Sequence, residues 1–205
     1  PSVNFFMGGL SVDKNYKTSV DHLYVVGECA SMYHGANRLG GNSLLAAIYS
    51  GHVAANAINT FAETKDCPNF ETYISEQEQV LEKRLQSKSR FSAVHVRHEI
   101  AKLLNDCLGI TRTEEKLLEG IKSVDYYISV SEKLIYAIDV SPYIGYSLKP
   151  MILLARAILT SALSRKETRG SHIREDYPQR SDEFALCSVC DYKNGEHHIS
   201  YIKED

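Results

Sequence analysis

The chain has 205 residues, 43% of them hydrophobic, and mixed charges that sum to a formal net charge of −3. This composition excludes a disordered chain, and a slightly negative chain without a basic stripe is expected to have no nucleic-acid partner. The length allows one large domain or two small ones with a substantial core. Five scattered cysteines, an odd number, indicate free thiols in a reducing compartment.

Membrane and targeting signals are weak in this sequence. The most apolar stretch, Val140–Leu163, is interrupted by Lys149 and Arg156, so we expect a core helix rather than a transmembrane segment. The N-terminal residues are not a charged leader region. We expect a cytoplasmic protein, with attachment to a membrane surface as the alternative. The opening apolar run without an initiator Met predicts that the chain is part of a longer protein.

The first part of the chain combines glycines with short apolar runs. Two of these runs are expected to form β-strands, residues 5–12 and 23–26. The second run ends at Glu28, and a glycine-rich loop follows. Asn42 or Ser43 is expected to cap a long helix that runs to about Phe61. A strand, a carboxylate, a polar loop and a capped helix in this order are typical of a site that holds a polar ligand against a helix N-terminus.

The rest of the chain is predicted to be helical up to about residue 165, after a linker at residues 64–68. Four helices are expected, at residues 69–85, 92–108, 113–130 and from Ser141-Pro142 to about residue 165. Four helices of this length form a small bundle. A polar loop follows them, and Asn194-Gly195 between two alternating runs predicts a terminal β-hairpin.

Metal binding is not expected. Two groups of potential ligands are present, Cys187 and Cys190 with His197-His198, and His95 with His98. The first has a zinc-like spacing, but residues three apart in a strand point to opposite faces. The second lies on one helix face without an acidic ligand nearby, which favours a solvated face.

Three segments near the N-terminus carry a specific pattern: Met7-Gly8-Gly9, residues 23–28 (Leu-Tyr-Val-Val-Gly-Glu) and residues 34–45 (His-Gly-Ala-Asn-Arg-Leu-Gly-Gly-Asn-Ser-Leu-Leu). The last run is too specific to arise by chance. Together they resemble the end of the flavin-binding domain in the succinate dehydrogenase, fumarate reductase and L-aspartate oxidase flavoprotein family. Residues 169–178 also resemble the loop that follows the last long helix in that family.

The resemblance implies a partial α/β element followed by an all-α region. Three parts are expected: the C-terminal part of an FAD-binding domain at residues 1–62, a helical domain at 63–167, and a loop with a terminal hairpin at 168–205. The family binds the FAD pyrophosphate with a G-x-G-x-x-G turn, which this sequence lacks. We therefore expect the isolated chain neither to bind FAD tightly nor to turn over.

The resemblance also assigns cofactor-binding roles. Glu28 is expected to accept hydrogen bonds from the ribityl hydroxyls of FAD; the alternative is a solvated turn acid. Asn42, Ser43 and Leu44 open the helix, and their backbone N–H groups are expected to face flavin N1 and the C2 carbonyl. Ordinary helix capping by Asn or Ser is compatible with that role.

Substrate binding is expected nearby. By resemblance, the Arg38 guanidinium clamps one carboxylate of a C4 dicarboxylate such as fumarate or succinate; the alternative is a structural arginine. His34 orients the loop or reaches substrate. Asn4-Phe5 stands where the family usually has His-Tyr, and asparagine can donate a hydrogen bond but supplies no positive charge. The exact substrate therefore stays open.

The implied reaction is hydride transfer between flavin and a C–C bond flanked by carboxylates, with a proton donor from outside this chain. Two alternatives remain. One is oxidation of an amino acid, as in L-aspartate oxidase. The other is a docking role for the helices, with an iron–sulfur or other electron-transfer subunit as partner.

Overall fold

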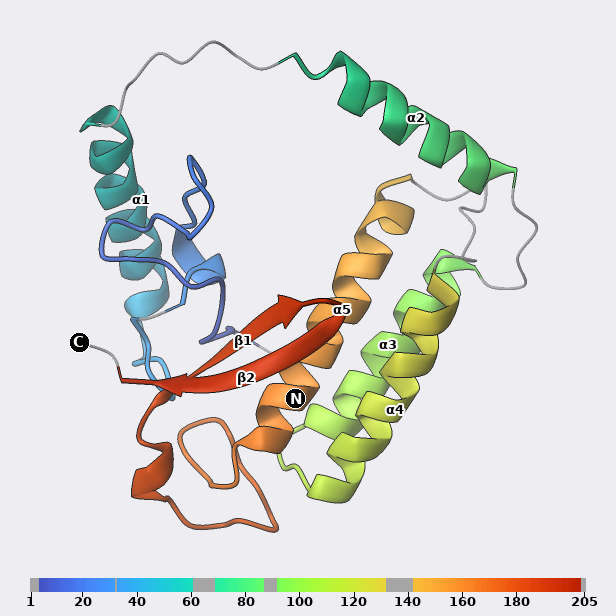
Figure 1. The fold of residues 1–205 in the computed structure, drawn as a ribbon. Coiled ribbons are helices and arrows are strands. Elements are labelled where there is room, and N and C mark those ends of the chain that lie inside the picture. The colour runs from blue at the N-terminus through green and yellow to red at the C-terminus, as the bar shows by residue number, and fades with distance from the viewer. Residues whose placement is uncertain (1–3, 32, 61–68, 87–91, 132–141, 204–205) are drawn as a thin grey trace. The chain divides into compact units, whose positions relative to one another are not determined.

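The computed structural model describes residues 4–31, 33–60, 69–86, 92–131 and 142–203, and it divides the chain into two compact units (Figure 1). Unit 1 comprises Pro1–Cys67 and Arg169–Ser171, and unit 2 comprises Pro68–Thr168 and His172–Asp205. The expected linker at residues 64–68 lies outside the described residues. The three-part division of the chain at residues 62 and 167 stays a prediction.

Unit 1 contains a 3₁₀ turn, η1 (Gly27–Cys29), and one long helix, α1 (Asn42–Thr60). The expectation of strands at residues 5–12 and 23–26 is wrong for this structure. The described residues of unit 1 form β-bridges only at single positions, between Leu10 and Ala30 and between Lys17 and Tyr24. A strand needs a hydrogen-bonded neighbour along its length, and these residues meet such a neighbour at isolated points only.

The core of unit 1 is small. It consists of Val12, Tyr16, Val25, Ala30 and Ala54. A fully buried hydroxyl, that of Ser50 on α1, holds the helix against η1: it accepts a hydrogen bond from the Gly27 backbone N–H at 2.9 Å and donates to the Ala47 carbonyl at 3.0 Å. The helix therefore fixes the turn that carries Glu28.

Unit 2 contains the remaining helices, α2 (Glu71–Leu85), α3 (Ala93–Leu108), α4 (Glu114–Ser131) and α5 (Pro142–Ser164), and a 3₁₀ turn, η2 (Asp182–Phe184). Side-chain oxygens mark two of the starts. Asn69 Oδ1 accepts the Glu71 backbone N–H at 2.8 Å, and Thr113 Oγ1 accepts that of Lys116 at 3.4 Å. A proline opens α5, where its missing N–H costs nothing.

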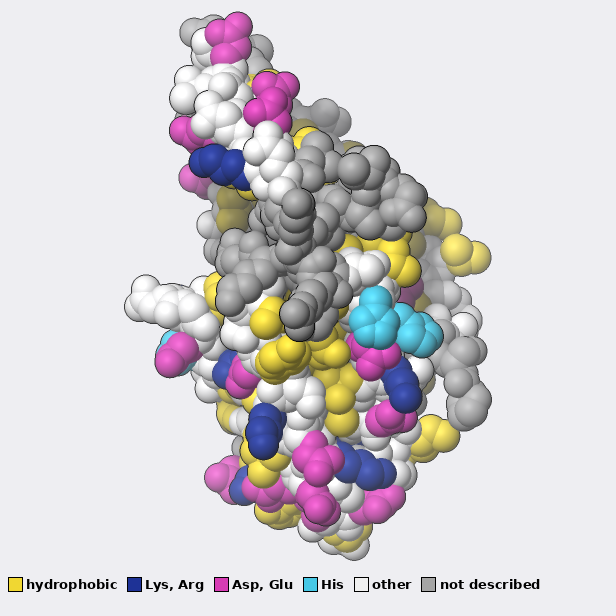
Figure 2. Space-filling model, turned by 90° about the vertical axis from the view of Figure 1, so that its right-hand side faces the viewer, with side chains coloured by type: hydrophobic (Ala, Val, Ile, Leu, Met, Phe, Trp, Pro, Cys, Tyr) yellow, Lys and Arg dark blue, Asp and Glu magenta, His cyan; other side chains and the backbone are white. Residues whose placement is uncertain are grey.

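Three of these helices form the bundle. Buried apolar side chains of α3, α4 and α5 make one continuous core: Val96, Ile100, Leu117, Val124, Ile152 and Leu159 are each at most 1% exposed. None of the described side chains of α2 is buried, so α2 is not part of the expected four-helix core. Figure 2 shows acidic, basic and apolar side chains interspersed over the described part of one face, as on a solvated surface.

The central helix of the bundle is α5. Its stretch Ile144–Ser164 has a mean hydropathy of 1.2 and, among the described helices, passes a test of length and composition for crossing a membrane. Length and composition alone are weak evidence for a membrane span, because the core helix of a soluble protein has the same properties. The α5 stripe of Leu148, Ile152, Ala155 and Leu159 packs in the core of the bundle, as expected for a core helix.

The predicted hairpin is confirmed. Strands β1 (Cys187–Lys193) and β2 (Glu196–Ile202) pair antiparallel, and Lys193 faces Glu196 across the turn. Asn194 has φ 54° and Gly195 has φ 86°. Positive φ at both central residues defines the type I′ turn that Asn-Gly favours. Tyr201 on β2 bonds Ser164 on α5 at 2.8 Å between hydroxyls, so the hairpin covers the end of α5.

Candidate functional site

The glycine-rich loop of unit 1 ends in an electropositive helix start. Gly41 has φ 84°, a left-handed conformation that glycine adopts without strain, and Asn42 is the first helical residue. The expected cap at Asn42 or Ser43 is therefore misplaced, because the glycine turns the chain into the helix. The first turn holds no acidic side chain. The N–H groups of Ser43 and Leu44 have no intrahelical partner, so the helix start carries partial positive charge.

Glu28 lies on η1, which packs against α1. Its carboxylate is exposed, and Oε1 accepts the Phe6 backbone N–H at 2.8 Å. Among the described residues, Oε2 makes no hydrogen bond. Gly27 has φ 69° and is held by Ser50 and by the Tyr33 hydroxyl, which donates to its carbonyl. One carboxylate oxygen therefore stays available to a ligand on a rigid turn.

The loop brings Phe5, His34 and Arg38 together. The imidazole of His34 meets the Phe5 ring edge-on, with 5.1 Å between the ring centroids. The Arg38 guanidinium carbon lies 4.6 Å from the centre of the same ring, a cation–π arrangement. Phe5 thus supports both polar side chains, a contact that the sequence analysis did not foresee.

One edge of the Arg38 guanidinium is open in the sense that it has no hydrogen-bond partner among the described residues. Nη1 donates to the Leu39 carbonyl at 3.1 Å, whereas Nε is buried and has no partner among the described residues. The edge formed by Nε and Nη2 is one that binds a carboxylate with two parallel hydrogen bonds. Arg174 uses this edge within the same chain: its Nε and Nη2 bond the two Asp176 oxygens at 2.8 and 2.7 Å.

His34 is the second polar group with an unsatisfied atom. Its Nε2 is buried without a partner among the described residues. Burial, and then the nearby Arg38 charge, lower the pKa of His34 below 6.5. The imidazole is therefore neutral at pH 7 and offers one hydrogen bond at Nε2 to a ligand.

The other expected site residues lie around this cluster. Asn4 is exposed and directly precedes Phe5. Asn42 and Ser43 are half-buried, and Leu44 is 74% exposed. Because no described contact joins Asn4 or Leu44 to Arg38, their roles stay predictions.

A distant segment contacts the loop. The Ser171 backbone N–H donates to the Ala36 carbonyl at 3.2 Å, and Gly170 packs against the same carbonyl. Residues 169–171 belong to unit 1 for this reason. Residues 169–178 resemble a family loop in sequence, but no sequence pattern places any of them beside Ala36. Only the glycine at 170 was available as a signal.

The chain after Ser171 belongs to unit 2, where a buried arginine organises it. Arg174 is fully buried, and its Nη1 donates to the carbonyls of Ala162, Leu163 and Arg165 at 3.0 to 3.3 Å. It thereby caps the C-terminal end of α5. Its hydrogen bonds lower the pKa of Asp176 to about 2. Arg174 therefore fixes the loop.

His172 has a similar structural role. Its Nδ1 lies 3.1 Å from Arg112 Nη1, and its Nε2 lies 3.0 Å from the Arg165 carbonyl oxygen. Burial, and then the neighbouring arginines, lower the pKa of His172. A neutral ring that donates from Nε2 and accepts at Nδ1 satisfies both contacts.

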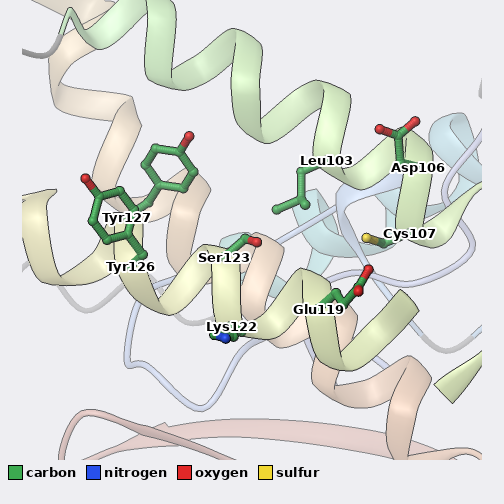
Figure 3. A pocket seen from close by; sticks show the side chains of 8 residues that line it. All are labelled: Leu103, Asp106, Cys107, Glu119, Lys122, Ser123, Tyr126 and Tyr127. Atoms are coloured by element: carbon green, nitrogen blue, oxygen red, sulfur yellow. The ribbon is translucent and has the colours of Figure 1, made fainter. Parts of the chain in front are cut away.

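A hollow of about 610 Å³ lies between α3 and α4 in unit 2. Figure 3 shows Asp106 and Cys107 projecting from α3, and Glu119 and Tyr127 from α4. Burial raises the pKa of the Cys107 thiol, which keeps it protonated and unreactive. Among the described residues, no group of three histidine, cysteine or acidic side chains is placed to hold a metal ion. The hollow is therefore not the candidate site.

Two models of known families match this chain. Residues 97–204 match the family model described as the C-terminal region of the fumarate reductase flavoprotein, and residues 1–44 match an FAD-binding domain model. The second match contains Glu28, His34 and Arg38 and ends at Leu44, two residues into α1.

Individual relatives are similar over nearly the whole chain. An uncharacterised FAD-dependent oxidoreductase of Methanocaldococcus jannaschii is 33% identical over 90% of this chain and 34% of its own length. The succinate dehydrogenase flavoprotein subunit of Bacillus subtilis is 30% identical over 89% of this chain and 33% of its own length. The L-aspartate oxidase of Pyrococcus furiosus is 31% identical over 95% of this chain and 34% of its own length. The chain thus spans about a third of their length.

The fold has known counterparts as well. A solved structure of quinol fumarate reductase from E. coli superposes with a TM-score of 0.81 at 28% identity, over 97% of this chain and 36% of that one. The C-terminal family model alone covers more than half of the chain. The chain therefore belongs to the fumarate reductase and succinate dehydrogenase family of flavoproteins, with FAD as the cofactor.

Proposed function

We propose that this chain is part of an FAD-dependent oxidoreductase that transfers hydride between FAD and a C4 dicarboxylate of the fumarate or succinate type. The single observation that carries the proposal is the open Nε–Nη2 edge of Arg38, located a few residues before the electropositive start of α1. The guanidinium edge suits an anionic substrate, and the helix start suits an electron-rich cofactor.

The residues of the loop and α1 fit FAD. The N–H groups of Ser43 and Leu44 point out of the helix start, where they stabilise negative charge. Glu28 keeps one carboxylate oxygen for hydroxyl donors. A Cβ built at Gly40 or Gly41 would meet nothing within 4 Å, so the backbone leaves open space there. FAD supplies the two-electron carrier when bound; these residues hold and orient it.

Substrate binding falls to Arg38 in this proposal. Its open edge clamps one carboxylate with two hydrogen bonds, while the Phe5 ring supports the guanidinium from one face. Such a clamp fixes the reacting carbons in a near-attack position and withdraws electron density from them. Neutral His34 adds a hydrogen bond from Nε2, and Asn4 provides an uncharged amide beside Phe5. The proton for the adjacent carbon comes from a residue outside this chain.

The test uses the full-length flavoprotein that contains this chain. Arg38→Ala should lower kcat/KM for fumarate reduction and succinate oxidation by about a hundredfold or more, because a charge-assisted bidentate bond is lost. Arg38→Lys should recover little, since an ammonium cannot make the fork. Arg97→Ala is the control, because Arg97 is exposed on α3. Full activity of Arg38→Ala with unchanged KM would refute the clamp.

A second activity is supported by one observation: the L-aspartate oxidase relative is as similar to this chain as the succinate dehydrogenase relative. The same preparation should therefore be assayed for iminoaspartate formation from L-aspartate. Turnover of aspartate without turnover of succinate or fumarate would replace the dicarboxylate proposal by amino-acid oxidation. Arg38 would then clamp a carboxylate of aspartate.

The flavin must exchange electrons with a second reactant in every turnover, so we also propose an electron-transfer partner, such as an iron–sulfur subunit. We also propose that the protein lies in the cytoplasm or on a membrane surface. Purification from the native cell at low ionic strength should co-elute iron with flavin. A flavoprotein that elutes alone and turns over with oxygen would contradict the partner and favour an oxidase.

The isolated 205 residues are proposed to be inactive. Their glycines form no G-x-G-x-x-G turn for the FAD pyrophosphate. Adding FAD to the purified chain, followed by gel filtration, should leave the protein colourless. A yellow preparation with stoichiometric flavin would overturn this proposal.

A further inference from the structure

The segment Arg169–Ser171 packs against the substrate loop of unit 1 with little free space. The Ser171 backbone N–H donates to the Ala36 carbonyl oxygen at 3.2 Å, and the Ser171 hydroxyl lies 3.4 Å from the same oxygen. Gly170 has φ 58°, and a Cβ built on it would lie 2.1 Å from that oxygen and 2.8 Å from the Ala36 Cβ. Real Cβ atoms essentially never come so close, so only glycine fits at position 170.

The contact falls at the centre of the functional loop. Ala36 lies two residues after His34 and two residues before Arg38. A backbone shift at Ala36 therefore moves both side chains that carry unpartnered buried nitrogens. Arg38 is also held by its stacking on Phe5 and by its bond to the Leu39 carbonyl, both of which depend on the course of this loop.

The ends of the short segment are well anchored. The Thr168 hydroxyl accepts the Arg174 backbone N–H at 2.9 Å and lies 3.0 Å from the Tyr177 carbonyl. On the other side, the His172 ring bonds Arg112 and the Arg165 carbonyl. An added methyl group at residue 170 would meet the Ala36 backbone, and because Ala36 is exposed, its loop is the part of unit 1 that is free to move.

We propose that Gly170, with Ser171, is a positioning residue for Arg38: their contact with the Ala36 carbonyl holds the open guanidinium edge where it binds a substrate carboxylate. The inference rests on the proposed function of Arg38 as a clamp. Gly170 touches neither substrate nor cofactor in this view. Its role is to exclude a side chain from the space that the Ala36 carbonyl occupies.

The test is Gly170→Ala in the full-length flavoprotein. The Kd of succinate, measured by perturbation of the flavin absorption, and the KM should both rise about tenfold, because small misplacements of a clamp are costly. The FAD content should stay unchanged and kcat should fall less than about threefold. A rise in KM without loss of flavin is a result that a merely destabilised protein does not give.

Gly195→Ala is the matched control. Gly195 also has a positive φ, 86°, but a Cβ there would meet nothing within 4 Å. Both substitutions carry the same kind of backbone strain, and only the one at residue 170 adds a collision. Equal succinate Kd values for the two variants would overturn the proposal.

A double-mutant cycle shows whether Gly170 acts through Arg38. Adding Gly170→Ala to Arg38→Ala should leave the succinate Kd unchanged, since the residue being positioned is gone. A tenfold effect that persists in the Arg38→Ala background contradicts the inference alone. An Arg38→Ala protein that binds succinate normally contradicts the proposed function instead.

Ser171→Ala covers the case in which Gly170→Ala does not fold or loses FAD. This change keeps the backbone and removes only the hydroxyl contact with Ala36, so the succinate Kd should rise about twofold. If Gly170→Ala cannot be studied and Ser171→Ala leaves the Kd unchanged, the proposal is overturned.

Discussion

The two units of the molecule are stabilised differently. Among the described residues, unit 2 buries a continuous core of eleven from the three helices α3, α4 and α5, whereas the core of unit 1 has five. Large apolar side chains on or near α1 stay exposed, with Leu39 and Leu44 at 74% and Ile48 at 72%. Hydrophobic burial is the main favourable term in folding, so unit 2 is expected to be the more stable of the two.

Their polar groups differ in the same way. In unit 2 the buried guanidinium of Arg174 has hydrogen-bond partners, because it donates to Asp176 and to three backbone carbonyls. In unit 1, His34 Nε2 and Arg38 Nε are buried without partners among the described residues, whereas in unit 2 the one such atom is the uncharged Thr160 hydroxyl oxygen. Unpartnered buried nitrogens cost stability unless a ligand satisfies them. Unit 2 thus satisfies its buried charge internally, whereas unit 1 keeps the unpartnered nitrogens on which the proposed binding role rests.

The largest effect is expected from the buried arginine of unit 2. Arg174→Met should lower the free energy of unfolding by about 3 to 5 kcal/mol, because the end of α5 loses its cap and Asp176 loses its partner. Urea titration followed by circular dichroism measures this. Arg97→Met is the control, because the same change on the exposed face of α3 should cost less than about 0.5 kcal/mol. Equal costs would mean that Arg174 does not organise the unit.

The core of the bundle should respond almost as strongly. Leu159 is fully buried on α5, and Leu159→Ala should cost about 2 to 5 kcal/mol through lost burial and the cavity left behind. Leu154 lies on the same helix but is 61% exposed, so Leu154→Ala should change stability by less than about 0.5 kcal/mol. Thermal or urea unfolding separates the two. A costly Leu154→Ala would show that this face of α5 is covered.

The stability of unit 2 should depend on pH through His172. Its pKa in the fold is lowered by burial and by nearby arginines, so the unfolded chain binds the proton more readily. This stabilisation is complete above pH 6.5 and is lost as pH falls below it, by at most about 1.4 kcal/mol per pH unit. The pKa of His197 is also lowered, mainly by burial. His172→Gln should flatten the dependence of the unfolding free energy between pH 7 and 5; an unchanged slope would contradict this origin.

The smallest effect on the isolated chain is expected on α1. Ile48→Gln should change its unfolding free energy by less than about 0.5 kcal/mol, since the side chain is already 72% exposed. In the full-length flavoprotein the same change should lower the amount of bound FAD, because we expect this face to be covered there. Flavin absorbance per polypeptide measures it.

The matched control on α1 is Ile58→Gln. Ile58 lies ten residues further along, about 2.8 turns, and therefore on another face of the helix. Ile58→Gln should therefore leave the flavin content of the full-length protein unchanged. If Ile48→Gln destabilises the isolated chain as strongly as a core substitution, the contrast between the two units is wrong.

Much of the local structure could be predicted from the sequence. Helix starts and ends follow from side chains within a few residues, such as Asn69, Thr113 and Pro142. The Asn194-Gly195 turn is equally local, because it needs only two residues that accept positive φ. The family resemblance located Glu28, His34 and Arg38 on one turn and loop, which sequence neighbours can specify.

Tertiary structure alone decided how these parts are supported and which groups stay open. The strands predicted at residues 5–12 and 23–26 depend on partners elsewhere and pair only at single points. The Phe5 ring beneath Arg38 and the contact of Gly170 with Ala36 join residues far apart in the chain. The sequence by itself determined where helices, turns and chemically active side chains occur, because those signals act over a few residues. Burial, hydrogen-bond satisfaction and collisions depend on distant segments, so only the folded chain decided them.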